Sequence, residues 1–204
     1  MILILSALLF SLSSNLDNLV IGIAYGIKKI KIGLSANFII AIITTAGTFL
    51  SMLIGKFISK FLPQSVANIL GALIIIALGL MFVIQSILKL INNKKAKELA
   101  LKDISDMVEY AEISDLDKSG DINIKEAVLI AFGLTFNNIG TGVAASITGV
   151  SIYFTSIATF ILSIITIIIG EVIGNNILGK LLGKFAPLIS GILLIILGII
   201  EILN

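Results

Sequence analysis

Residues Ser14 to Ala24 read S-N-L-D-N-L-V-I-G-I-A, inside a longer apolar run from Ile2 to Tyr25. A transmembrane helix needs about 20 consecutive, mostly apolar residues, and this run has that length. Asp17 stands well inside the run, where a charged side chain costs roughly 3 kcal/mol or more. The stretch therefore predicts a membrane span that carries a polar functional site.

The rest of the chain predicts an all-α membrane protein with six transmembrane helices. Of the 204 residues, 58% are hydrophobic and 13% are charged, whereas about 25% of a typical soluble domain is charged. The five further spans are Leu34 to Ile54, Val66 to Ile91, Ala127 to Val150, Ile152 to Ile173 and Pro187 to Leu203. The first span should be a retained helix, because a signal peptide has basic residues before a short, uncharged apolar region.

The two halves of the chain resemble each other. Residues Leu134 to Ala144 read L-T-F-N-N-I-G-T-G-V-A, and a shift of 120 residues aligns Asp17 with Asn137 and Asn18 with Asn138. The same shift pairs Gly22 with Gly142, Ala24 with Ala144 and Gly71 with Gly191. Because each half has an odd number of spans, the second half should insert upside down, as in many secondary transporters.

These features predict that the chain is divided into three segments. Residues 1–91 form the first three-helix repeat, residues 92–123 a polar loop, and residues 124–204 the second repeat. Cytoplasmic loops carry an excess of Lys, and the lysines fall mostly in the first, third and fifth loops. The lysines of these three loops are Lys28, Lys29, Lys31, Lys94, Lys95, Lys97, Lys102, Lys118, Lys180 and Lys184. The loops on the opposite side contain only Lys56 and Lys60. We therefore expect a multi-pass protein of the cell membrane with a cytoplasmic central loop and both termini outside.

Missing residue types restrict the chemistry. The chain has no His and no Cys, and all 14 basic residues are Lys. A metal site must then be built from oxygen ligands, which suit Mn, Mg and Ca. A nucleotide-binding G-x-x-x-x-G-K-[ST] motif is absent from the sequence, and the lysines are too scattered for nucleic-acid binding. We expect no enzyme activity and no organic cofactor, with the lipid bilayer and a divalent metal ion as partners.

The candidate metal ligands are Asp17, Asn18, Asn137 and Asn138, which an inverted repeat brings to similar depth. One carboxylate with several neutral oxygens would bind a divalent ion weakly enough to release it. The alternative is that the amides hydrogen-bond across helices and only hold them together, with Asp17 protonated among them.

Four further residues are candidates for a transport path: Asn15, Thr44, Thr48 and Glu171. Thr hydroxyls commonly bond their own helix backbone. Glu171 lies near the end of its span, where it can reach the interface or act as an entry ligand. Oligomeric state is left open.

The segment Asp115 to Glu126, D-L-D-K-S-G-D-I-N-I-K-E, fits the calcium-loop pattern of an EF-hand. The residues at positions 1, 3, 5, 7 and 12 of that loop are Asp115, Asp117, Ser119, Asp121 and Glu126. Gly120 stands at the turn. The alternative is an acidic turn that caps the following helix.

The six short spans, the polar central loop and the L-D-N motif of the first span resemble the MntP family of manganese efflux pumps. The stretch S-N-L-D-N-L-V-I-G-I-A-Y-G and the loop D-L-D-K-S-G-D-I-N-I-K-E-A are most similar to the YtaF branch of sporulation membrane proteins. The resemblance implies Mn(II) efflux. Family members typically carry an S-L-D-A-type motif in both halves, whereas this chain has Asn137 in place of the second Asp.

Three functions remain open from the sequence. The first is a gradient-driven exporter of a divalent cation, with Mn first and Ca or Mg as alternatives. The second is a non-transporting sporulation membrane protein that acts in assembly or ion sensing. The third is a carrier for a small organic solute, disfavoured because the chain has no Arg to bind a carboxylate.

Overall fold

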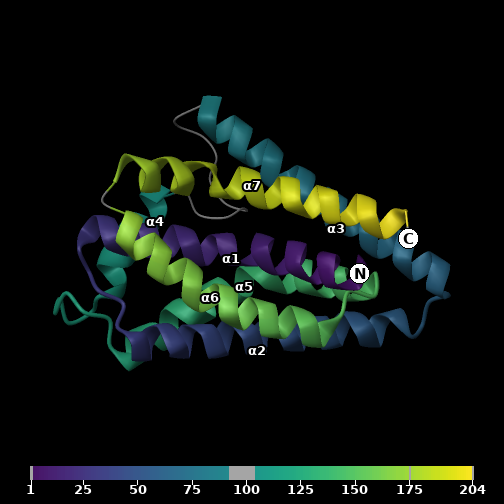
Figure 1. Ribbon diagram of the computed structural model, residues 1–204, viewed down its shortest axis with the longest axis horizontal. Coiled ribbons are helices and arrows are strands. Elements are labelled where there is room, and N and C mark those ends of the chain that lie inside the picture. The colour runs from purple at the N-terminus through teal and green to yellow at the C-terminus, as the bar shows by residue number, and fades with distance from the viewer. Residues whose placement is uncertain (1, 92–103, 175, 204) are drawn as a thin grey trace.

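The computed structural model describes residues 2–91, 104–174 and 176–203, without the side chains of 2, 3, 89–91, 104–106, 137 and 177–180. The regular elements in these ranges are all helices (Figure 1). They are α1 (Ile2–Lys28), α2 (Leu34–Ser59), α3 (Gln64–Ile91), α4 (Ile104–Ser114), α5 (Ile124–Ile147), α6 (Ile152–Ile173) and α7 (Ile177–Ile202). The expected all-α architecture is confirmed for the described residues.

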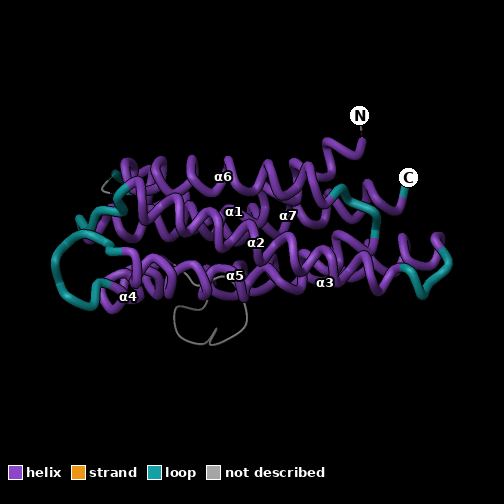
Figure 2. Tube along the Cα trace, turned by 90° about the horizontal axis from the view of Figure 1, so that it is seen from below, coloured by secondary structure: helices purple, strands orange, loops and turns teal. Residues whose placement is uncertain are grey.

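Five of these helices are long and apolar enough to cross a membrane without a break: α1, α2, α3, α6 and α7. Helix α5 is continuous by its backbone hydrogen bonds. However, its axis turns by 49° between Ile124–Phe136 and Asn138–Ile147, and it is a sixth span if both pieces cross together. The chain is thus a multi-pass membrane protein with five or six spans. The long helices run along the long axis of the molecule (Figure 2).

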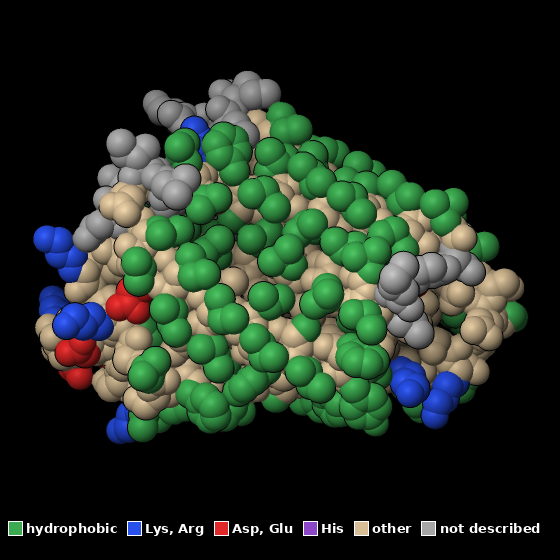
Figure 3. Space-filling model, viewed as in Figure 1, with side chains coloured by type: hydrophobic (Ala, Val, Ile, Leu, Met, Phe, Trp, Pro, Cys, Tyr) green, Lys and Arg blue, Asp and Glu red, His purple; other side chains and the backbone are tan. Residues whose placement is uncertain are grey.

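The outer surface of the bundle is apolar. Figure 3 shows hydrophobic side chains over the middle of the molecule and Lys side chains at its two ends. Large apolar residues such as Phe38, Leu50 and Phe57 are more than half exposed. Soluble monomers rarely expose contiguous apolar patches of this extent, so the middle of the bundle fits the hydrocarbon region of a bilayer.

Helices far apart in the sequence form the main packing pairs: α1 with α6, α2 with α5, and α3 with α7. Small residues line each crossing. A Cβ added to Gly170 of α6 would lie 2.6 Å from the Leu19 carbonyl oxygen of α1. Cβ atoms added to Gly79 of α3 or Gly191 of α7 would each lie 2.7 Å from the other's carbonyl oxygen. Without a hydrophobic driving force between helices in lipid, such close approach stabilises their association.

One predicted boundary is wrong. The sixth span was expected to begin at Pro187, but α7 begins at Ile177 and contains Pro187 in its interior. Proline has no N–H, so the carbonyl of Gly183 loses its usual helical donor. Membrane helices tolerate such prolines because neighbouring groups can satisfy the freed carbonyl. A proline was therefore a poor boundary signal in this apolar segment.

The end of the bundle that carries Lys28, Lys29 and Lys31, called here the first-loop end, also holds α4. Lys28 at the end of α1 donates a hydrogen bond to the Glu112 carboxylate of α4. The predicted polar segment 92–123 is described from Ile104 onward. Lys94, Lys95, Lys97 and Lys102 lie outside the described residues.

The loop after α4 is joined to the loop after α1 by two backbone hydrogen bonds. The Lys31 N–H donates to the Gly120 carbonyl at 2.9 Å, and the Ile122 N–H donates to the Lys31 carbonyl at 2.9 Å. Ile30, Ile32 and Ile122 are buried beside this bridge in one apolar cluster. Contacts that join these two loops also join α1, which carries Asp17, to the start of α5.

Candidate functional site

The polar stretch predicted in the first span is buried at the centre of the bundle. Asp17 and Asn18 are each 2% exposed and Asn15 is 1% exposed. Helix α1 packs on α6 and α7 and also contacts α5 and α4, so its polar residues have no access to lipid. Polar groups buried in a membrane protein mark ion or substrate pathways more often than chance would give.

A hydrogen-bonded chain of side chains joins three helices at this point. The Asn15 amide nitrogen donates to the Ser11 carbonyl at 2.7 Å, and the Asn18 amide nitrogen donates to Asn15 Oδ1 at 2.8 Å. The same Asn18 nitrogen lies 2.9 Å from the Ser163 hydroxyl of α6. The Ser163 and Thr44 hydroxyl oxygens are 3.5 Å apart, which brings in α2.

The second half of the chain contributes Asn138. Its amide nitrogen donates to the Ser14 carbonyl of α1 at 3.1 Å, one turn before Asn18. Helix α5 bends at this point, between Phe136 and Asn138. Helix breaks of this kind expose backbone dipoles that bind ions in transporters.

Three of the four predicted metal ligands are placed by the structure: Asp17 and Asn18 are consecutive buried residues of α1, and Asn138 reaches the same helix from α5 through the Ser14 carbonyl. Asn137 occupies the bend itself, and its side chain lies outside the described residues.

The predicted path residues differ in their placement. Asn15 and Thr44 belong to the hydrogen-bonded chain, and the Thr44 hydroxyl also donates to the Ile40 carbonyl at 2.8 Å. Thr48 is buried one turn further along α2 and has no part in that chain. Glu171 is partly exposed at the first-loop end of α6, facing Ile32 and Lys31.

Two residues at this junction were missed from the sequence: Ser163 and Asn37. Asn37 of α2 is 1% exposed, and its amide nitrogen donates to the Ile164 carbonyl of α6 at 3.1 Å. The sequence does carry a signal for Ser163. It lies 119 residues after Thr44, and the same spacing separates Gly174 from Gly55, so the two pairs fit one internal repeat. The sequence carries no comparable signal for Asn37, because the hydrogen bond of Asn37 to α6 depends on α2 lying beside α6.

The donor set is composed of oxygen. The Asn18 amide and the Thr44 and Ser163 hydroxyls meet at the junction, the Asn138 amide bonds α1 one turn away, and the buried Asp17 carboxylate is next to Asn18 in the sequence. Hard divalent cations such as Mn²⁺, Mg²⁺ and Ca²⁺ prefer these ligands. The ligand types present, one carboxylate with several neutral amide and hydroxyl groups, are chemically compatible with a dehydrated or partly dehydrated cation.

A second group of acids lies outside the spans, in the EF-hand-like loop. Carboxylate oxygens of Asp115, Asp117 and Glu126 all lie within 4.8 Å of one another. Gly120 has φ +79°, the left-handed conformation that a glycine adopts without strain. The Asp115 carboxylate accepts from the backbone N–H groups of Ser119 and Gly120, each at 3.0 Å.

The alternative role for this loop, a helix cap, is also present. Asn123 caps α5 with its side-chain oxygen, and Glu126 Oε2 accepts from the Asn123 N–H at 2.9 Å. This reciprocal pair is a capping box. Glu126 Oε1 accepts from the Leu116 N–H at 2.8 Å. The Ser119 hydroxyl donates to the carbonyl of Asp121, an exposed residue, at 2.8 Å.

Two acids at this end have lowered pKa values. The pKa of Asp117 is held below its ordinary 3.8 because its carboxylate accepts hydrogen bonds from Ser119 and Asn123. The pKa of Glu112 is below its ordinary 4.5 because of the hydrogen bond from Lys28 and its charge.

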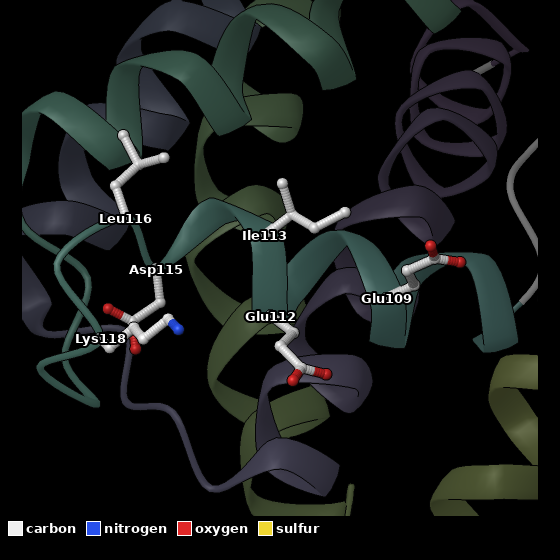
Figure 4. Close-up of a pocket in the computed structure, with 6 residues that line it drawn as sticks. All are labelled: Glu109, Glu112, Ile113, Asp115, Leu116 and Lys118. Atoms are coloured by element: carbon white, nitrogen blue, oxygen red, sulfur yellow. The ribbon is translucent and has the colours of Figure 1, made fainter.

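A shallow hollow beside α4 lies at the same end of the bundle. It is lined by Glu109, Glu112, Ile113, Asp115, Leu116 and Lys118 (Figure 4). Asp115 and Lys118 lie together in the loop, whereas Glu109 and Glu112 come from α4. The hollow is separate from the junction around Asn18, which lies among the spans.

A family model described as "Putative manganese efflux pump" matches residues 2–83, which include Asp17, Asn37 and Thr44. "Probable sporulation protein YtaF" of Bacillus subtilis (strain 168) is 35% identical over 205 residues, covering 95% of this chain and 97% of that protein. No solved structure gives a significant match.

Proposed function

The chain belongs to the MntP family, in the branch of the YtaF sporulation proteins, and we propose that it exports a divalent cation. The favoured substrate in this proposal is Mn²⁺. The observation that carries the proposal is the buried, hydrogen-bonded junction of Asn18, Thr44 and Ser163, with Asp17 next to Asn18 on α1 and Asn138 bonded to α1 one turn away. Such a site binds Mn²⁺ through the ligand type that this ion prefers.

The proposal includes an inverted repeat, which the helix pairing supports. If α1, α2 and α3 correspond to α5, α6 and α7, then exchanging the halves converts the α1–α6 pair into the α5–α2 pair. Both pairs are main packing pairs, and α3–α7 is converted into itself. A two-fold axis in the membrane plane requires this pairing.

The burial pattern gives independent support. A shift of 120 residues superimposes buried positions of α1 on buried positions of α5: Ala7/Ala127, Phe10/Ile130, Ile21/Thr141, Gly22/Gly142, Ala24/Ala144 and Tyr25/Ala145. A shift of 119 residues does so for α2 and α6: Ala36/Thr155, Ile40/Thr159, Thr44/Ser163, Thr48/Ile167, Ser51/Gly170 and Gly55/Gly174.

The third helices also fit a shift of 119. Their coinciding buried positions are Ala67/Ala186, Gly71/Ser190, Ala72/Gly191, Ile75/Leu194, Gly79/Gly198 and Phe82/Glu201. Gly71 then corresponds to Ser190 instead of Gly191. One residue fewer in the connection before α6 accounts for the change from 120 to 119.

The cation would cross by alternating access. Asp17 supplies the formal charge that draws the ion from water, and the amide and hydroxyl dipoles replace its hydration shell. Rocking of one half against the other about the shared axis would open the site to each side in turn. No nucleotide-binding motif is present in the sequence, so an ion gradient would drive export. The lysine distribution supports a cytoplasmic first-loop end with both termini outside the cell membrane.

Metal binding tests the site directly. Mn²⁺ should bind to the protein in nanodiscs, and Asp17→Asn should weaken that binding because it removes the charge but preserves the side-chain shape. Free Mn²⁺ can be followed by its electron paramagnetic resonance signal. Glu112→Gln is the matched control, since it removes an exposed carboxylate from α4. Measured in protein that also carries Asp117→Asn, which removes a carboxylate of the EF-hand-like loop, equal affinity with and without Asp17→Asn would exclude Asp17 as a ligand.

The second candidate function, cation sensing without transport, is favoured by the geometry of the EF-hand-like loop. Three carboxylates from positions 1, 3 and 12 converge there. The loop is also bonded to Lys31, next to the end of α1. Occupancy of the loop would then be communicated to the helix that carries Asp17.

Asp117→Asn separates this second function from helix capping. Asp117 is exposed and accepts a hydrogen bond from the Asn123 amide nitrogen. The capping box itself uses Asn123 Oδ1 and the Glu126 carboxylate, so α5 should remain capped. If the loop binds metal, Ca²⁺ or Mn²⁺ should protect the backbone amides of residues 115–122 from hydrogen exchange in the wild type and not in Asp117→Asn. Identical exchange with and without metal in the wild type would rule the loop out as a sensor.

A further inference from the structure

The amide of Asn18 has a fixed orientation. The Ser11 backbone carbonyl can only accept, so the Asn15 nitrogen must face it and Asn15 Oδ1 must face Asn18. Asn18 therefore donates with its nitrogen. Its carbonyl oxygen is buried and receives no hydrogen bond from the residues that the structure describes. Leaving a buried acceptor unsatisfied costs about 1–3 kcal/mol, so this oxygen requires a ligand.

The side-chain carbonyl oxygen of Asn37 is also buried without a hydrogen-bond donor among the described residues. Its nitrogen donates to the Ile164 backbone carbonyl, which can only accept. Asn37 Oδ1 is consequently the free end of the amide, and it too is buried without a donor in the described part of the chain. Neither amide can be flipped to remove the problem, because a flip would place the Asn18 oxygen against Asn15 Oδ1 and the Asn37 oxygen against the Ile164 carbonyl, neither of which can donate.

Both amides are anchored on consecutive residues of α6. Asn18 contacts the Ser163 hydroxyl and Asn37 contacts the Ile164 carbonyl. Asn37 lies in the first turn of α2, where its N–H bonds the Gly33 carbonyl. Thr44 is seven residues deeper, about 10 Å along the helix axis. Glu171 of α6, two turns from Ser163, lies toward the first-loop end.

We propose that a divalent cation travels between the junction and the first-loop end along the α2–α6 interface, with the Asn37 carbonyl oxygen as an intermediate ligand. This inference deepens the proposed function and rests on it. The order of ligands from the aqueous end is Glu171, Asn37, the Thr44–Ser163 hydroxyls, and then Asn18 with Asp17. Neutral amide and hydroxyl oxygens bind the ion between the two carboxylates without trapping it.

The natural chain has no cysteine, which makes single-cysteine accessibility a clean test. Asn37→Cys should react with a charged methanethiosulfonate reagent added on the first-loop side of reconstituted vesicles. Mn²⁺ at about ten times its Kd should slow that reaction about tenfold, because the occupied fraction is protected. Ala131→Cys is the matched control. Ala131 lies on α5, outside the α2–α6 interface, is 0% exposed and belongs to the apolar cluster, so its thiol should stay unmodified.

Ser163→Cys provides a second variant of nearly the same size as the natural residue, in case Asn37→Cys does not fold. It should show the same Mn²⁺ protection at a slower rate, since it lies deeper. Unreactive thiols at both positions in folded protein, or reactions that Mn²⁺ does not slow, would overturn the path. Wild-type Mn²⁺ flux measured in the same vesicles separates the two proposals. Flux with unreactive thiols refutes only this path, whereas absent flux refutes transport itself.

Discussion

The hydroxyl oxygens of Thr44 and Ser163 lie 3.5 Å apart across the α2–α6 interface, although 119 residues separate them in the sequence. These residues are equivalent if the halves of the chain are inverted repeats. A residue and its equivalent touch only where the symmetry axis passes between them. The contact therefore locates the proposed axis beside Asn18, which bonds the same serine.

Cross-linking tests this relationship. We expect the double variant Thr44→Cys with Ser163→Cys to form a disulfide under mild oxidation, because its sulfur atoms would replace hydroxyl oxygens that lie 3.5 Å apart. Intramolecular closure can be measured by mass spectrometry after alkylation.

The control pair is Ile42→Cys with Ser163→Cys. Ile42 is 47% exposed on the outer face of α2, so its thiol should remain free. Equal yields from the two pairs would mean that α2 and α6 are not held in the described register.

Close approach of α1 and α6 predicts a strong effect of one methyl group. Gly170→Ala would place its Cβ 2.6 Å from the Leu19 carbonyl oxygen, and overpacking of this kind costs about 1–3 kcal/mol. Gly140→Ala on α5 meets nothing within 4 Å and should change stability by less than about 1 kcal/mol. The free energy of unfolding in mixed micelles measures both. A Gly170→Ala protein as stable as Gly140→Ala would contradict the packing.

Backbone conformation predicts a separate effect in the EF-hand-like loop. Gly120 has φ +79° and no neighbour within 4 Å of an added Cβ. Gly120→Ala should therefore destabilise the loop by roughly 1–2 kcal/mol through strain alone. Gly33→Ala is the control, since φ at Gly33 is −57° and its surroundings are equally open. Faster hydrogen exchange at residues 115–122 should appear only in Gly120→Ala.

The lowered pKa of Glu112 predicts a pH dependence at the first-loop end. A carboxyl whose pKa is lowered on folding stabilises the fold above its ordinary pKa, and that contribution is lost as pH falls through the lowered value. Docking of α4 on Lys28 should thus weaken as pH falls below 4.5. Exchange rates of α4 amides measure this change. In Glu112→Gln the part of the pH dependence due to this pair should disappear; an unchanged profile would mean that the pair does not dock α4.

Much of the fold could be predicted from hydropathy. The long apolar runs gave α1, α2, α3 and α6 to within a few residues because bilayer thickness sets helix length. Asp17, Asn18 and Asn15 could also be singled out from the sequence, since polar residues in an apolar run stand out, and the structure buries all three. Pro187 was misread as a helix start because proline breaks helices in water more strictly than in a bundle within the membrane.

Ser163 and Asn37 were missed for a different reason. Isolated Ser and Asn residues in apolar helices usually bond their own backbone, so their types carry little information. Their contribution arises from the packing of α2 on α6, which brings Asn37 to Ile164 and Thr44 to Ser163. Neither contact follows from hydrophobic periodicity, because periodicity identifies the buried face of a helix and not its partner.

Mn²⁺ flux through the purified protein in proteoliposomes tests the central proposal most directly, with the wild type compared with Asp17→Ala and with Glu112→Ala as the surface control. We predict saturable flux in the wild type and in Glu112→Ala, and its loss in Asp17→Ala, because Asp17 supplies the charge of the site. Folded wild-type protein that moves no Mn²⁺, Mg²⁺ or Ca²⁺ would contradict transport and favour sensing by the Asp115–Glu126 loop. Undiminished flux in Asp17→Ala would contradict the site.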